Sequence, residues 1–227
     1  MSSGSQYENL EKVAAVLAKV SSKFEFTGGA TIILYVDSLI QDELRITKDV
    51  DCVIDINSRA EYYQLSEQLR AIGLEECLGK NEPICRWQYQ DQIIDIMPCE
   101  PSILGFSNRW YAEGIEQAIS TVLPSGREIL IFSPLHLLAS KIEAFSGRGQ
   151  SFIFSKDIED IITLLDGCQD LAQEFDTEEG ELKSFVSEWF VDNREELKDA
   201  AYNFSLSGNS RREKLILNII DKFAQGL

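Results

Sequence analysis

Three aspartates stand out because each lies in a segment whose pattern predicts a β-strand. Asp49 and Asp51 are two residues apart where apolar and acidic residues alternate. Side chains two positions apart in a strand project from the same face, about 6.5 Å apart, and such carboxylates can hold a pair of magnesium ions. Asp95 is the single charge in the apolar segment 93–97, where a carboxylate is costly unless it is paired or bound to a cation. One interpretation is a metal site. The alternatives are that Asp49 and Asp51 lie on a solvated strand face and that Asp95 is buried with hydrogen-bond partners from the protein.

A pair of glycines, Gly28 and Gly29, lies upstream of these aspartates. The pair falls between a short strand pattern at 24–26 and the apolar segment 30–36, which we expect to be helical. Backbone N–H groups at such a junction, without side chains in the way, suit the approach of a phosphate. An ordinary turn would use the same two residues.

The elements that position these residues divide the chain into two halves. Up to residue 132 the patterns predict an α/β core, and from Ser133 they are nearly all helical, with Ser133 suited to a helix N-cap and Pro134 to the first helical position. We therefore predict an α/β domain over 1–132 and a helical domain over 133–227. The expected elements are helices at 10–20, 30–36, 60–72, 133–145, 156–165, 178–198 and 210–224, strands at 24–26 and 49–56, and hairpins at 84–97 (turning at 90–91) and 120–132 (turning at 124–126).

Charge limits the partners of the protein. With 21 basic and 38 acidic residues its formal net charge is -17, a field that repels nucleic acid unless basic residues cluster locally. The basic groups are small: Arg45 with Lys48 near the aspartates, and Arg211, Arg212 and Lys214 near the end. Duplex nucleic acid is disfavoured, whereas a small anionic substrate neutralised by metal ions is compatible.

The remaining composition is that of an ordinary folded protein in a cytoplasm. No apolar run is long enough for a membrane span, and the first residues lack the pattern of a secretory signal. Five cysteines, an odd number without a close pair, are expected to be reduced and structural. The single histidine, His136, has no partner at catalytic spacing and is expected to be a packed or surface residue.

Taken together, these segments resemble a known superfamily. The run 26–31 (Phe-Thr-Gly-Gly-Ala-Thr), the run 45–51 (Arg-Ile-Thr-Lys-Asp-Val-Asp) and the run 94–96 (Ile-Asp-Ile) are similar, in that order, to the DNA polymerase β-like nucleotidyltransferases. Within them the chain looks like the branch of AbiEii-type toxins and minimal nucleotidyltransferases. In the helical half, segment 133–145 with Arg148 and segment 156–160 (Lys-Asp-Ile-Glu-Asp) resemble the lysine helix and the K-D-x-x-D helix of that branch. Ala30 departs from it, because the branch usually has Ser or Thr at this position and here Thr31 follows one residue later.

The resemblance implies an α+β fold, with a nucleotidyltransferase-type mixed β-sheet flanked by helices and followed by a C-terminal helical domain. It implies that Asp49, Asp51 and Asp95 bind two Mg²⁺ ions, or Mn²⁺ in their place, and that Asp95 helps to deprotonate the acceptor. The glycines would cradle the triphosphate of an NTP. The further implied nucleotide contacts are Lys141 and Arg148, with supporting roles for Thr31, Lys48, Asp157 and Asp160.

The helical pattern places Lys141 off the apolar stripe of its helix, so we expect it to be exposed and to contribute little to folding. Asp157 and Asp160 share a helix face; they would either hold Lys141 or Arg148 in place or only stabilise a helix N-terminus.

The function expected from this resemblance is transfer of an NMP from an NTP to an acceptor, with release of pyrophosphate. The acceptor (an RNA 3′ end, a protein hydroxyl or a small molecule) is left open. One alternative is a binding module of the same fold, which recognises a protein partner in a toxin–antitoxin or phage-defence pair. Another is an unrelated metal-dependent phosphohydrolase, which would release inorganic phosphate.

Overall fold

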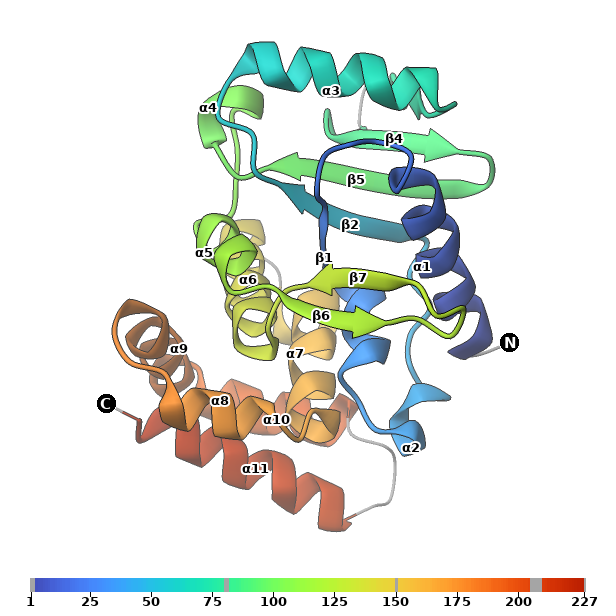
Figure 1. Ribbon diagram of the computed structural model, residues 1–227. Coiled ribbons are helices and arrows are strands. Elements are labelled where there is room, and N and C mark those ends of the chain that lie inside the picture. Colours follow the sequence, from blue (N-terminus) through green and yellow to red (C-terminus); the bar gives the residue numbers. More distant parts are fainter. Residues whose placement is uncertain (1–2, 80–81, 150, 205–209, 227) are drawn as a thin grey trace. The chain divides into compact units, whose positions relative to one another are not determined.

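The computed structural model describes residues 3–79, 82–149, 151–204 and 210–226. The chain forms two compact units (Figure 1), one of Met1–Ile33 with Leu44–Ser133 and one of Leu34–Glu43 with Pro134–Leu227. The sequence places a change of pattern at residue 133, but nothing in it shows that Leu34–Glu43 groups with the helical part. The predicted domains, an α/β core over 1–132 and a helical domain over 133–227, stay a prediction.

The first unit is built on a mixed β-sheet, which the described residues form from seven strands in the order β3-β4-β5-β2-β1-β7-β6 (Figure 1). Strand β2 runs parallel to β5 and β1 runs parallel to β7, while the other neighbours are antiparallel. The predicted α+β class, with a mixed sheet flanked by helices, is confirmed. The strands are β1 (Glu25–Thr27), β2 (Asp49–Ile54), β3 (Glu75–Glu76), β4 (Arg86–Tyr89), β5 (Gln92–Pro98), β6 (Ile119–Val122) and β7 (Glu128–Ile131).

In strands β2 and β5 the three aspartates alternate with fully buried apolar residues. In β2 the side chains of Val50 and Cys52 are fully buried, and in β5 those of Ile94 and Ile96 are as well. Helix α1 (Ser3–Leu17) contacts both strands. Because side chains alternate across a strand, burying these four residues sends Asp49, Asp51 and Asp95 to the opposite face.

Short helices complete the first unit, and their ends follow from local chemistry. The Ser58 side chain accepts a hydrogen bond from the Glu61 N–H at 3.3 Å and caps α3. Serine at this position commonly satisfies one of the backbone N–H groups that have no partner in the first turn of a helix. The predicted helix at 30–36 is a 3₁₀-helix, η1, that begins directly after Gly28. The elements are η1 (Gly29–Leu34), α3 (Arg59–Ala71), α4 (Pro101–Leu104) and α5 (Tyr111–Glu116).

The second unit is helical in all its described regular elements, and one predicted helix is divided. The sequence predicts a single helix at 178–198, whereas the chain leaves helical geometry at Asn193 (φ -116°, ψ 20°). The Asn193 backbone N–H still makes the helical hydrogen bond to the Trp189 carbonyl, at 3.1 Å. Its Nδ2 donates to the same carbonyl at 2.8 Å, a local side-chain bond of the kind that competes with helix continuation. The elements are α2 (Ser38–Gln41), α6 (Pro134–Arg148), η2 (Phe152–Phe154), α7 (Lys156–Gly167), α8 (Leu171–Thr177), α9 (Glu181–Asp192), α10 (Arg194–Phe204) and α11 (Ser210–Ala224).

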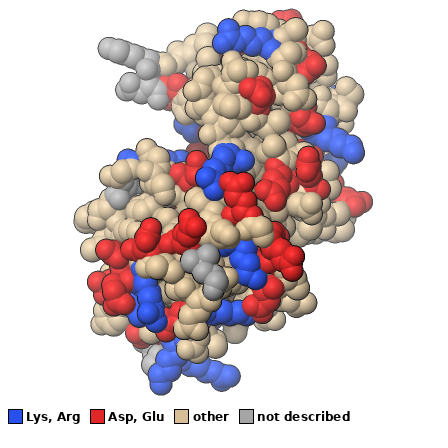
Figure 2. Space-filling model, turned by 90° about the vertical axis from the view of Figure 1, so that its left-hand side faces the viewer, with Lys and Arg blue, Asp and Glu red and all other residues tan. Residues whose placement is uncertain are grey.

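The surface carries the acidic excess of the sequence. On the face drawn in Figure 2, Asp and Glu side chains form several groups, with Lys and Arg side chains between them. None of the helices in the described part of the chain combines the length and the apolar composition that a bilayer crossing requires. The five cysteines are free thiols, as predicted, and burial raises the pKa of Cys52, Cys85 and Cys168. His136 is buried, and burial lowers its pKa.

Buried ion pairs join α6 to α7 in the second unit. Lys141 Nζ lies 2.7 Å from Asp160 Oδ2 and 3.6 Å from Asp157 Oδ1. Arg148 also pairs with Asp157. Only 12% of the Lys141 side chain is exposed, and the two carboxylates are more deeply buried still. The prediction of an exposed Lys141 is therefore wrong, because the sequence pattern of α6 alone does not reveal the acidic face of α7.

We predict that Lys141→Ala lowers the free energy of unfolding by about 3–5 kcal/mol, because it leaves two buried carboxylates without their shared cation. Urea unfolding of wild type and variant measures the loss. Lys222→Ala is the matched control, since Lys222 pairs with Asp176 at 2.6 Å but both side chains are largely exposed; its cost should be below about 1 kcal/mol. Equal losses in the two variants would contradict the prediction.

Candidate functional site

The parallel pairing of β2 with β5 brings the three aspartates together. Asp51 lies directly opposite Asp95, and Asp49 lies opposite Ile93 on the same pair of strands. Because the three alternate with buried apolar residues, their side chains occupy one face of the sheet. The structure therefore assembles on neighbouring strands the residues that the sequence singles out.

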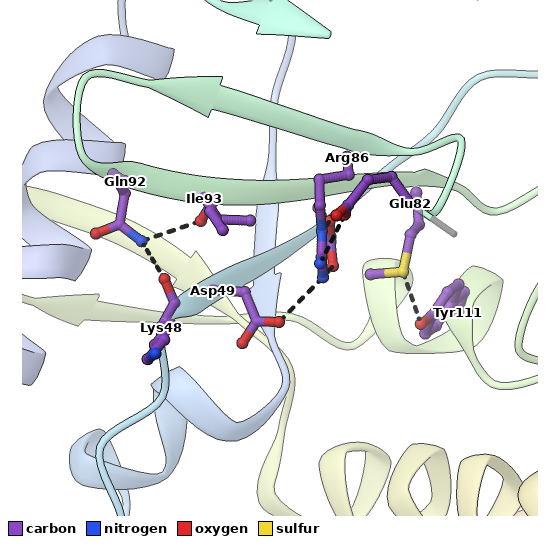
Figure 3. Close-up of polar contacts among 9 residues, drawn as sticks. Lys48, Asp49, Glu82, Arg86, Gln92, Ile93 and Tyr111 are labelled. Carbon is purple, nitrogen blue, oxygen red and sulfur yellow. Dashed lines mark hydrogen bonds and ion pairs between the residues drawn. The ribbon is translucent and has the colours of Figure 1, made fainter. Parts of the chain in front are cut away.

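An arginine that the sequence analysis did not single out holds two of these carboxylates (Figure 3). Arg86 of β4 donates to Asp95 through two atoms, Nε to Oδ1 at 2.8 Å and Nη2 to Oδ2 at 2.7 Å. Its Nη2 also lies 3.2 Å from Asp49 Oδ2, and its Nη1 lies 3.2 Å from Glu82 Oε2. A two-point pairing of this kind is among the stronger charged hydrogen bonds in proteins. Chiefly through the hydrogen bonds with Asp95, the pKa of Arg86 is raised above its ordinary value, so the guanidinium stays charged.

A signal for Arg86 is present in the sequence. The predicted hairpin turns at Gln90 and Asp91, and counting back equally on both sides brings Arg86 opposite Asp95. The structure has this register, and Gln90 takes the left-handed conformation (φ 56°) at the turn. Opposite charges that face each other across two strands stabilise the pairing.

The glycine turn packs directly against the second aspartate. Gly28 has a φ of +75°, and a Cβ at this position would lie 1.9 Å from Asp51 Oδ2. The turn is fixed by Thr31, whose buried hydroxyl donates to the Gly28 carbonyl at 2.9 Å. Thr31 thus has a supporting contact inside the turn. A glycine is required here on two grounds, the backbone conformation and the space that the carboxylate occupies.

The other predicted residues lie in different surroundings. The backbone carbonyl of Lys48 accepts a hydrogen bond from Gln92 Nε2 at 3.0 Å (Figure 3), which ties the start of β2 to β5. Four predicted residues, namely Lys141, Arg148, Asp157 and Asp160, belong to the second unit. There they form the ion-pair network between α6 and α7, which agrees with the expectation that the two aspartates hold the two basic residues.

The donor chemistry of the three aspartates suits a hard divalent cation, which prefers carboxylate oxygens. Asp49 is 41% exposed while Asp95 is only 10% exposed, so the group is open on the Asp49 side. Within the described residues, however, no three His, Cys, Asp or Glu side chains are already spaced to enclose a metal ion. In this structure Asp49 and Asp95 pair with the Arg86 guanidinium instead. The three aspartates thus fit a divalent ion in donor type and in their common face of the sheet, but not in their present spacing.

Comparisons with known proteins agree with this architecture. The chain matches no protein-family model and no curated protein. It is similar to the crystal structure of an antigenic nucleotidyltransferase-like protein from Paracoccidioides brasiliensis, with a TM-score of 0.55 and 21% identity over 89% of this chain and 94% of that one. It is also similar to the solution structure of the antibiotic-resistance factor ANT(2'')-Ia, with a TM-score of 0.52 and 14% identity over 86% of this chain and 96% of that one. The chain therefore has a nucleotidyltransferase-like fold.

We predict that Gly28→Ala displaces Asp51 and lowers the free energy of unfolding by about 2–5 kcal/mol, from the left-handed backbone and the overlap with the carboxylate together. Gly126→Ala is the matched control: Gly126 also has a positive φ (+84°), but a Cβ there would meet no atom within 4 Å. Its cost should be about 1–2 kcal/mol, from the backbone alone. Thermal unfolding of both variants measures the difference, and a loss at Gly28 no larger than that at Gly126 would refute the close approach.

We predict that Arg86→Gln destabilises the metal-free protein by about 3 kcal/mol, because Asp95 loses its buried partner. Added Mg²⁺ should then raise the melting temperature more in the variant than in wild type, since Asp49 and Asp95 are released for the ion. Calorimetry at increasing MgCl₂ concentrations measures both effects. Arg70→Gln is the control, because Arg70 pairs with Glu67 and Glu76, outside the aspartate group. The same Mg²⁺ response in wild type and Arg86→Gln would show that Arg86 does not compete with the ion.

Proposed function

We propose that this protein is a metal-dependent nucleotidyltransferase, which moves an NMP from an NTP to a hydroxyl acceptor and releases pyrophosphate. One observation carries the proposal: Asp51 and Asp95 face each other on parallel strands, with Asp49 on the same face and the Gly28 turn against Asp51. The nucleotidyltransferase-like fold supports it.

In this proposal the aspartates have distinct roles that follow from their surroundings. Asp49 and Asp51 would hold two divalent ions, Mg²⁺ or Mn²⁺, and Asp95 would ligate one of them. When bound, such ions polarise the α-phosphate and stabilise the pyrophosphate that leaves. The less exposed Asp95 is our candidate to accept the proton of the acceptor hydroxyl. The positive charge of Arg86 keeps the group folded until the cations arrive, because three crowded carboxylates would otherwise repel one another.

The nucleotide contacts are proposed from the turn and from the resemblance in sequence. Gly28 and Gly29 lie where β1 passes into η1, and neither has a side chain of its own that would block a phosphate from the backbone. In the second unit Lys141 and Arg148 stay predicted phosphate contacts. Because Lys141 is paired with buried carboxylates, NTP titrations need a variant that keeps the charge, such as Lys141→Arg. The AbiEii-type branch also stays a prediction.

A binding module without transferase activity is the second candidate, and the Arg86 contacts favour it. A guanidinium that pairs with Asp95 and Asp49 supplies the positive charge that the carboxylates need, so the fold has no requirement for metal. In that case the protein would recognise a protein partner, as in a toxin–antitoxin or phage-defence pair. A response of wild type to Mg²⁺ distinguishes the two candidates.

We predict that wild type releases pyrophosphate from at least one NTP in the presence of Mg²⁺ and transfers the α-phosphate label to an acceptor. Asp51→Asn should reduce transfer at least 100-fold, since a lost ligand removes several kcal/mol of charge stabilisation (about 1.4 kcal/mol per factor of ten). Its fold should stay intact. The assay uses each α-labelled NTP with RNA, protein lysate and pooled small molecules as acceptors.

The products of this assay separate the alternatives. Release of inorganic phosphate in place of pyrophosphate would indicate a phosphohydrolase. The absence of transfer with every NTP, together with no thermal response of wild type to Mg²⁺ or Mn²⁺, would contradict the transferase proposal and leave the binding module.

A further inference from the structure

A cavity of about 540 Å³ lies in the first unit, next to the aspartate group. Its walls come from α3, β3, the start of β4 and α4, all within the same unit, and Arg86 is one of its lining residues. The same guanidinium therefore contacts Asp95 and lines the cavity. A molecule that touches Arg86 from the cavity would be separated from Asp95 by a single side chain.

The cationic side chains of this cavity are unusual in so acidic a protein. Arg59, Arg70 and Arg86 line it against one acidic residue, Glu76, while the chain as a whole carries a net charge of -17. Arg70 is paired with Glu76 and with Glu67. Arg59 is different, because its contact is with a backbone carbonyl: Nη2 donates to the Ser102 oxygen at 3.1 Å. Its charge is available to an anion.

The rest of the lining is apolar or aromatic. Tyr63 is 69% exposed and Ile84 is 65% exposed, yet both line the cavity, and large apolar side chains grouped at a surface commonly mark a binding site. Tyr62 is less exposed, and burial raises its pKa to about 12, so its hydroxyl stays protonated as a hydrogen-bond donor. Such a lining suits a ligand with a planar or apolar body and few polar groups.

The position of Arg86 gives a reason for a negative charge on the ligand. When Asp49 and Asp95 turn to divalent ions, the guanidinium loses two of its three carboxylate contacts and keeps Glu82 at Nη1, and it is only 20% exposed. The Nε and Nη2 donors that Asp95 satisfied would then need a new acceptor. An anionic group in the cavity would supply one.

We propose that this cavity is the acceptor site, and that the acceptor is a small hydroxylated molecule with an aromatic or apolar body and one anionic group. The inference rests on the proposed transferase function. The acceptor oxygen forms a bond to the α-phosphorus as the bond to the pyrophosphate oxygen breaks. The hydroxyl proton passes to Asp95 after Arg86, which pairs with both oxygens of that carboxylate in this structure, has moved away from it. The products are the nucleotidylated acceptor and pyrophosphate. A polycationic acceptor is disfavoured by the three arginines.

Three probes with the same ring and hydroxyl but different charge test the ligand class: 4-(hydroxymethyl)benzoate, 4-(hydroxymethyl)benzamide and 4-(hydroxymethyl)benzylamine. NMR titration of the full chain, without NTP, measures their binding. The benzoate should bind at least 10-fold more tightly than the amine and shift the amide signals of α3 and α4. Arg59→Gln should weaken the benzoate about 5- to 10-fold and leave the benzamide unchanged.

Arg127→Gln is the matched control, because Arg127 is an exposed arginine of the same unit that does not line this cavity. An equal loss of benzoate affinity in both arginine variants would show that only the overall charge of the protein matters and would overturn the proposal. The proposal would also be overturned if the amine bound more tightly than the benzoate or if no probe bound. Tighter binding of AMP than of the benzoate would overturn it too and would indicate a nucleotide acceptor.

The labelled-NTP assay separates a failure of this inference from a failure of the proposed function. If wild type transfers label to some acceptor but the benzoate does not bind, the cavity assignment fails alone. If the benzoate binds as expected but no NTP supports transfer, the transferase proposal fails, and the acceptor role of the cavity fails as well.

Discussion

The site depends on one constraint, the parallel pairing of β2 with β5 in a register that sets Asp51 opposite Asp95. Neighbouring strands lie about 4.8 Å apart. The pairing therefore places the negative charges of the two strands close together, where they repel one another. The apolar residues of both strands are buried on the other face and hold the register, because a slip by one residue would exchange the two faces. Arg86 offsets the repulsion. The site is thus a compromise between core packing, which imposes the register, and electrostatics, which requires a cation beside it.

Much of this arrangement follows from local sequence patterns. The alternation in β2 and the Gln90-Asp91 turn are short-range signals, and both elements are present as predicted. The pairing of β2 with β5 is different, because the two strands are separated by α3 and the β4 hairpin, and no local pattern gives their direction or register. The resemblance to a known family supplied that arrangement. Without that resemblance, the sequence would not have placed Asp95 beside Asp49 and Asp51.

The pattern of a single helix does not show how deeply its polar residues are buried by another element, although the sequence analysis did offer Asp157 and Asp160 as partners of Lys141 or Arg148. Lys141 lies off the apolar stripe of α6 and therefore looked exposed, yet α7 covers it with Asp157 and Asp160. The same limitation applies to the end of the helix at Asn193, where one side-chain amide ends a pattern that continues in sequence. Periodicity records which residues are apolar. It does not record which polar residues find partners in another element.

The arginine ion pairs of the first unit are compatible with the proposed anionic substrates despite the acidic net charge. A net charge describes the field at a distance, where salt screens it within about 10 Å, but binding depends on the few charges that a ligand touches. In the first unit Arg59, Arg70 and Arg86 gather around one cavity, and two of them are held by carboxylates. A guanidinium in an ion pair is already positioned, so an incoming anion has less side-chain entropy to remove than it would with a free side chain. Because Arg86 bridges the cavity and the aspartates, a negative charge arriving on one side weakens its hold on the other. If the aspartates bind a divalent ion and the cavity receives an anion, as we propose, this one side chain would couple the two binding events energetically.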